Sequence, residues 1–159
     1  MAANNQNNAL ANANLQQTAA AFDVLKTTIL QVLQAQVDEA MKEQRERLEI
    51  KDDAFHNFSH VPSPSENPTC ERMFLVVLRN EHARCVLRLA DARNQLAAAP
   101  TRLDGVASVL SPLPNETIAE RDIRVTETLE GFFGKDVVEE AQKIIDDAAA
   151  AVALAAGQQ

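Results

Sequence analysis

The sequence predicts an all-α protein built on a long antiparallel helical hairpin, with shorter C-terminal helices packed along it as a bundle. First, only four glycines and six prolines occur in 159 residues, and they lie between periodic segments. Second, apolar residues recur at three- and four-residue spacings, the pattern of a helix with one buried face. Third, Trp and Tyr are absent, whereas a β-sandwich or barrel needs frequent turns and strands rich in β-branched or aromatic residues.

The N-terminal segment, residues 1–17, consists mostly of Asn, Gln and Ala and carries no charge. Polar, low-complexity stretches of this kind bury too little apolar surface to fold alone, so we expect a flexible arm. The alternative is an arm that orders against a neighbouring subunit. A single helical domain is predicted over residues 18–156, followed by a short tail, residues 157–159.

The first helix is predicted to start near Leu15 or Thr18 and to reach His60 at most. Its apolar positions recur about every 3.7 residues, nearer an 11-residue repeat than a heptad, which keeps the stripe on one face of a nearly straight helix. Between residues 22 and 37 the apolar face is wide, and wide faces are buried on more than one side. The members of this candidate interaction face are Phe22, Leu25, Ile29, Leu30, Val32, Leu33 and Val37.

The second half of the first helix differs in kind, because eleven of the sixteen residues from 38 to 53 are charged. This half is predicted to be a solvated outer turn or the thin seam of a two-helix contact. A proline-rich connection is predicted over residues 51–67, since three prolines within seven residues end any helix before Val61.

The second helix is predicted to begin at Pro68, with Asn67 as its N-cap, and to stop at Pro100. Residues 73–78 are apolar on all sides and are therefore expected at the centre of the core. The predicted core residues are Phe74, Val77, Leu78 and Cys85.

The remaining chain is predicted to form short helices. Residues 101–114 hold one of them, closed by Pro112 and Pro114. Asn115 or Thr117 caps the next, and the glycines at 131 and 134 break it. A final Ala-rich helix follows. Short connections favour antiparallel neighbours.

No catalytic, cofactor-binding or metal site is predicted. Four glycines leave little material for a phosphate-binding loop, and no nucleophile motif occurs. The histidines and cysteines lack the paired Cys-x-x-Cys spacing of zinc sites and predict no metal site: His56, His60, Cys70, His82 and Cys85. The sequence therefore predicts a protein that is not an enzyme and that needs no cofactor.

The formal net charge of −8 argues against direct nucleic-acid binding, which depends on Lys and Arg. Five arginines of the second helix scatter around its circumference and predict a surface laced with salt bridges: Arg72, Arg79, Arg84, Arg88 and Arg93. No apolar run suits a transmembrane segment, and the N-terminus is no secretory signal, so an intracellular protein is expected. Ser63 and Ser111 precede prolines and are candidate phosphorylation sites.

Function follows by elimination. The sequence predicts a structural or scaffolding subunit, cellular or viral, that binds other helices, either its own copies or those of a larger assembly, through apolar helical faces. The candidate interaction face is the expected site of self-association, unless the C-terminal helices cover it within one chain. The alternative is an amphipathic protein that binds the surface of lipid or polymer granules, although such helices are usually rich in Lys or Arg and this chain is acidic.

Overall fold

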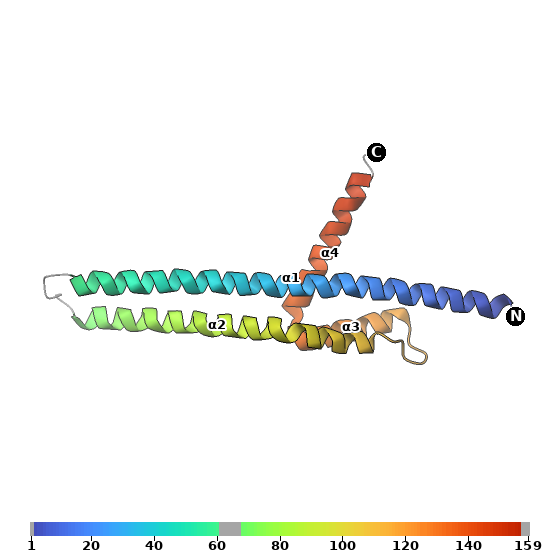
Figure 1. Ribbon diagram of the computed structural model, residues 1–159, viewed down its shortest axis with the longest axis horizontal. Coiled ribbons are helices and arrows are strands. Elements are labelled where there is room, and N and C mark those ends of the chain that lie inside the picture. The colour runs from blue at the N-terminus through green and yellow to red at the C-terminus, as the bar shows by residue number, and fades with distance from the viewer. Residues whose placement is uncertain (1, 61–67, 157–159) are drawn as a thin grey trace. The chain divides into compact units, whose positions relative to one another are not determined.

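The computed structural model describes residues 2–60 and 68–156, and the side chains of residues 18–58 and 71–156 within them. These residues form four helices: α1 (Ala2–His60), α2 (Pro68–Val109), α3 (Ile118–Phe133) and α4 (Lys135–Ala156) (Figure 1). No strand occurs in the described ranges. The predicted all-α class, with two long helices followed by shorter ones, is confirmed.

Contacts divide the chain into two compact units, and both long helices contribute to each. Unit 1 comprises Met1–Leu33 and Ala98–Gln159, and unit 2 comprises Gln34–Ala97. The prediction of one domain over residues 18–156 concerns cooperative folding, which a division by contacts does not test, so it stays a prediction.

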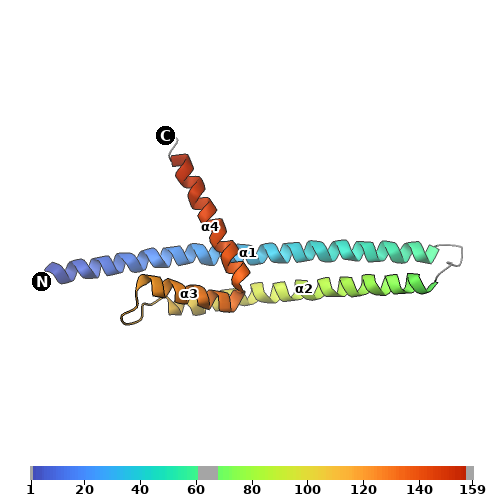
Figure 2. The same cartoon turned by 180° about the vertical axis from the view of Figure 1, so that it is seen from behind.

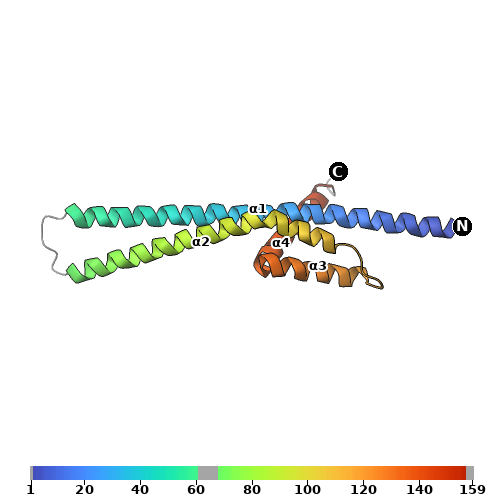
Figure 3. The same cartoon turned by 60° about the horizontal axis from the view of Figure 1, so that its bottom comes forward.

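Unit 2 is the helical hairpin, in which α1 and α2 run side by side (Figures 1 and 3). Side-chain contacts between them show that the helices are antiparallel. Met41 contacts Arg93, 52 residues away, whereas Arg47 contacts Glu81, only 34 residues away. The separation shrinks toward the connection, as it must when the chain reverses direction. Phe58 and Phe74 meet edge to face near that end, with ring centroids 6.2 Å apart.

Unit 1 combines the first part of α1 and the last part of α2 with α3 and α4. Lys26 Nζ lies 2.8 Å from Asp104 Oδ1 and ties α1 to α2. Arg102 of α2 donates a 2.8 Å hydrogen bond to the carbonyl of Phe132 at the end of α3. Figures 2 and 3 show α3 lying beside this part of α2. With four helical segments, unit 1 buries side chains from several directions.

The helix boundaries correct two predictions about the ends of the long helices. α1 begins at Ala2, well before the predicted start at Leu15 or Thr18. Ala and Leu are strong helix formers and residues 2–17 contain no Gly or Pro to stop a helix. The flexibility of the arm stays a prediction, since the side chains of residues 1–17 lie outside the described part, as does the tail.

The second correction concerns Pro100, where α2 was predicted to stop but instead continues to Val109. Proline inside a helix costs about 3 kcal/mol, because it removes one backbone hydrogen bond and its ring crowds the preceding turn. The turns beyond it bury Leu103 and Val106 completely. Each buried apolar side chain of this size contributes about 1.5–3 kcal/mol, so the packing in unit 1 offsets the proline. The separate short helix over residues 101–114 is thus the end of α2.

The predicted cap of α3 at Thr117 is confirmed. Its hydroxyl accepts a 3.2 Å hydrogen bond from the Glu120 N–H, and Glu120 Oε2 in turn accepts one from the Thr117 N–H. This reciprocal pair is a capping box. α3 ends before Gly134, whose φ of 86° suits a residue without a Cβ. Helix α2 begins at Pro68 and α1 ends at His60, as predicted. Residues 51–60 of the predicted proline-rich connection belong to α1, whereas Asn67 and the rest of that connection, residues 61–67, lie outside the described residues.

The predicted core over residues 73–78 is wrong for most of its members. Leu78 and Cys85 are buried, but Phe74 is 49% exposed and Val77 50% exposed. A hairpin gives each helix only one neighbour, so α2 can bury one stripe in unit 2. A segment that is apolar on all sides therefore leaves most of its apolar surface in solvent.

Candidate interaction surface

The candidate interaction face on α1 lies inside the chain's own core. Five of its seven members are buried, and Leu25 and Leu30 are half-buried. The buried members are Phe22, Ile29, Val32, Leu33 and Val37. The predicted association depended on an open apolar face in the monomer, and this face is covered within the chain. A role in binding another chain stays a prediction.

The described histidines and the described cysteine lie in different surroundings. His82 is half-buried and its Nε2 lies 3.1 Å from Gln44 Nε2, whereas His56 is exposed. The side chains of His60 and Cys70 lie outside the described residues. Within residues 18–58 and 71–156, no group of three or more His, Cys, Asp or Glu side chains is placed to hold a metal ion.

The thiol of Cys85 sits in the interior of unit 2. Burial, and after it the nearby Glu43 carboxylate, raises the pKa of this thiol above its ordinary value. A raised pKa leaves less of the nucleophilic thiolate at neutral pH. The arrangement is that of a packed core thiol, not of an activated nucleophile.

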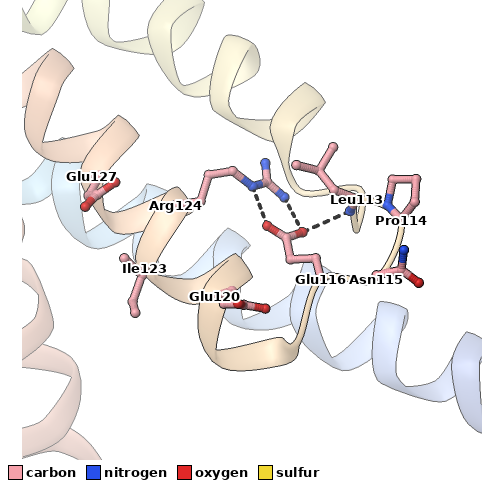
Figure 4. A pocket seen from close by; sticks show the side chains of 8 residues that line it. All are labelled: Leu113, Pro114, Asn115, Glu116, Glu120, Ile123, Arg124 and Glu127. Atoms are coloured by element: carbon pink, nitrogen blue, oxygen red, sulfur yellow. Dashed lines mark hydrogen bonds and ion pairs between the residues drawn. The ribbon is translucent and has the colours of Figure 1, made fainter.

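A surface hollow of about 510 Å³ opens where the loop after α2 meets α3 (Figure 4). Arg124 donates from Nε to Glu116 Oε1 and from Nη2 to Glu116 Oε2, both at 2.7 Å. Its Nη1 also donates to the carbonyl of Val109 at 2.6 Å, and the Leu113 N–H donates to Glu116 Oε2 at 2.9 Å. These groups satisfy one another, so the cluster clamps the loop and offers few free donors to a ligand.

The Glu116 carboxylate has a strongly shifted titration for the same reason. The hydrogen bonds from Arg124, and then the one from the Leu113 N–H, lower its pKa from 4.5 to about 2. These bonds favour the ionised form. Ser111, the phosphorylation candidate in this loop, is exposed, and its carbonyl accepts a 3.2 Å hydrogen bond from Arg124. Ser63 lies outside the described residues.

A second cavity in unit 1, of about 460 Å³, lies between the N-terminal part of α1 and helices α3 and α4. Arg121 lines it, and this side chain is buried although it is charged. Its Nη2 donates to the Thr18 hydroxyl at 3.0 Å, and its Nε lies 4.0 Å from Asp122 but has no hydrogen-bond partner. The walls of this cavity are mostly apolar. Arg121 is therefore a cation in an apolar environment, and its Nε–H has no acceptor.

In unit 2 the contact between α1 and α2 includes ion pairs. Arg47 Nη1 lies 3.2 Å from Glu81 Oε2, and Arg88 Nη1 lies 3.3 Å from both carboxylate oxygens of Glu43. The two alternatives left open for residues 38–53 are thereby decided in favour of a thin two-helix seam. Partly exposed ion pairs of this kind contribute little to stability, about 0–1 kcal/mol each.

The residues of α2 that face α1 in unit 2 follow a strict heptad. Their spacings alternate between three and four, and none of them is exposed. We call this set the inner seam: Leu75, Leu78, His82, Cys85, Leu89, Ala92 and Leu96. A stripe with this spacing suits packing against one neighbouring helix.

A second heptad runs along the opposite face of α2, two residues out of step with the first. At about 100° per residue, a two-residue offset turns the stripe to the far side of the helix. We call it the outer seam, and all its members are exposed: Met73, Val76, Asn80, Ala83, Leu87, Ala90 and Asn94. Met73 and Leu87 are each 65% exposed and Val76 is 53% exposed. This seam has no neighbouring helix among the described residues of unit 2.

The arginines of α2 separate into two groups, which only partly fits the predicted salt-laced surface. Arg88 pairs with Glu43, and Arg93 donates to the Met41 sulfur at 3.6 Å, so both turn toward α1. The other three are exposed and make no hydrogen bond or ion pair with any described residue: Arg72, Arg79 and Arg84. These three flank the outer seam.

Sequence reasoning missed the outer seam because it read the apolar run at 73–78 as core. The signal was present in the heptad spacing from Met73 to Asn94, which repeats the inner seam on the other face. The described residues of unit 2 provide a neighbouring helix for the inner seam only.

Among the described residues, no helix is long and apolar enough to cross a membrane. The chain matches no family model, and its comparison with curated proteins and with solved structures finds no similar protein.

Proposed function

We propose that this chain is a non-enzymatic structural or scaffolding subunit that binds other helices through an apolar helical face, and that this face is the outer seam of α2. The observation that carries the proposal is the contrast between the two sides of α2 in unit 2. The seam between the hairpin helices is partly polar, while large apolar side chains such as Met73 and Leu87 face solvent.

Burying apolar side chains at an interface stabilises the complex, by about 25 cal/mol for each Å² of apolar surface removed from water. Met73, Val76 and Leu87 are each more than half exposed in the hairpin, whereas a helix laid along the outer seam would bury all three. Their heptad spacing supports a helix as the ligand, because knobs-into-holes packing requires this repeat on each partner. Large exposed apolar side chains gathered on one face are typical of interaction sites.

The proposal is tested with a synthetic helical peptide that has a Leu/Ala heptad seam and uncharged Gln at the flanking positions. Fluorescence anisotropy should detect binding to the full chain, and Leu87→Glu should weaken it at least tenfold, since it places a carboxylate in a seam that excludes water. The matched control is Leu154→Glu on α4, at a residue 70% exposed and outside the seam. Equal binding by both variants would contradict the proposal, provided circular dichroism shows unchanged helix content.

A further inference from the structure

We infer that the partner of the outer seam is a helix with acidic flanking side chains, supplied by another polypeptide rather than by a second copy of this α2. The inference rests on the proposed function and adds the charge and register of the partner. It is carried by the side chains on either side of the seam.

In heptad notation, the outer seam places Met73, Asn80, Leu87 and Asn94 at the a positions. The e and g positions then flank the seam and face the corresponding positions of a partner helix. One flank holds Arg72, Arg79, Val86 and Arg93, and the other holds Val77, Arg84 and Asp91. Asp91 is the single acid on either flank.

The basic flanks are available for a partner because three of their arginines are not engaged within the described residues. Arg72, Arg79 and Arg84 make no ion pair there, whereas Arg88, which lies off the flanks, pairs with Glu43 across the hairpin. Acidic side chains at the partner's e and g positions would give each of these arginines an opposite charge. Flanking charges of this kind set partner choice and orientation more than raw affinity.

The same charges disfavour pairing of two α2 helices through this seam. In a parallel pair, a g position faces the e position five residues further along the other helix, so Arg79 would oppose Arg84. In an antiparallel pair like flanks meet, which brings the flank of Arg72 and Arg79 against its own copy. Both arrangements place like charges together in a protein whose net charge elsewhere is negative.

Asn80 and Asn94 favour a helix over an anionic lipid surface as the occupant. They lie on the centre line of the seam, two heptads apart, where a membrane-bound helix would need a continuous apolar face. In a coiled coil, a single polar residue at an a position fixes register and orientation at some cost in stability. The partner should therefore carry polar residues opposite these two positions.

The test compares two peptides that share one Leu/Ala heptad seam, with Asn opposite Asn80 and Asn94, but carry Glu or Lys at all e and g positions. Each is titrated into the full-length chain, with anisotropy as the readout. The Glu peptide should bind roughly tenfold or more tightly than the Lys peptide at low salt. The difference should shrink near 1 M salt, where the screening length is about 3 Å.

Charge reversal provides the decisive variant, because a loss of folding cannot mimic an inverted preference. Arg79→Glu with Arg84→Glu should bind the Lys peptide better than the Glu peptide. The control is Arg45→Glu with Lys143→Glu, an equal change in charge at two exposed residues away from the seam. This control should keep the preference of the wild type.

Four other results would overturn the inference. Equal binding of both peptides, abolished by Leu87→Glu, would leave the proposed function standing and remove the acidic partner. If the wild type sediments as a dimer and the Leu87→Glu variant as a monomer, a second copy of the chain occupies the outer seam. Binding to vesicles of phosphatidylcholine and phosphatidylserine, lost in the charge-reversed variant while neither peptide binds, would make the seam a lipid surface. If none of the three peptides, with Glu, Lys or Gln at the flanking positions, binds to the chain, the proposed function fails as well.

Discussion

Units 1 and 2 are built from the same two long helices, yet they bury their side chains to very different degrees. The largest completely buried side chains all belong to unit 1: Ile29, Leu33, Leu103, Val106 and Leu129. The buried apolar residues of unit 2 are fewer and each keeps some exposure: Val37, Leu78, Cys85 and Leu89.

The difference follows from the number of neighbours. In unit 1, α3 and α4 add two helical segments, so α1 and α2 can each bury more than one stripe. In unit 2 each helix has one neighbour, and that contact includes ion pairs such as Arg47 with Glu81. Apolar residues in a helix make a core only where there are enough helices to surround them, and otherwise they stay exposed.

The strongest test of this comparison is Ile29→Glu combined with Leu33→Glu in unit 1. Both side chains are completely buried, and an unpaired carboxylate in such a site costs several kcal/mol. We expect loss of the folded state, seen as a collapse of the thermal transition in circular dichroism. A variant that stays folded but loses self-association in light scattering would show instead that this face binds a second chain.

The second test compares truncations in the two units. Leu103→Ala should lower the free energy of unfolding by about 2–5 kcal/mol, because it leaves a cavity in a site closed on all sides. Leu78→Ala in unit 2 should cost less, since Leu78, although buried, has only one neighbouring helix and solvent can enter the space that the truncation leaves. Urea denaturation of both variants measures the difference. Equal losses in the free energy of unfolding would contradict the difference in packing between the two units.

The third test is the acid dependence of the clamp in unit 1. Because the pKa of Glu116 falls from 4.5 to about 2 on folding, its ionised form stabilises the native state above pH 4.5. This contribution is lost as the pH falls from 4.5 toward 2, where the native carboxylate is protonated. The melting temperature of the wild type should decrease over this window, and that of Glu116→Gln should depend less on pH. Identical profiles would show that the clamp contributes nothing.

The smallest effect is expected for Phe74→Ala in unit 2. The ring is half exposed and contacts Phe58 at its edge, so its removal should cost about 1 kcal/mol, well below the loss for a buried Phe. If urea denaturation shows that the free energy of unfolding falls by several kcal/mol, the ring is part of a core, and the hairpin does not leave it half exposed.

The helices themselves, and several of their ends, could be predicted from the sequence because those signals are local. Thr117 followed by Glu120 three residues later builds its capping box from neighbouring atoms alone. Gly134 ends α3 because its backbone adopts a positive φ, and Pro68 opens α2 because its missing N–H is not needed there. None of these features depends on what lies across the molecule.

The tertiary structure alone decided which apolar faces are core and which are surface. The sequence shows a wide apolar face near Ile29 and an equally apolar run near Phe74, and it led to the opposite assignment of the two. α3 and α4 pack in unit 1, where the first lies, and so the first is covered while the second faces solvent. α2 continues through Pro100 for a similar reason. The burial of Leu103 and Val106 outweighs the free-energy cost of a proline inside the helix. Local chemistry sets where helices form, but burial depends on neighbours that lie far away in the sequence.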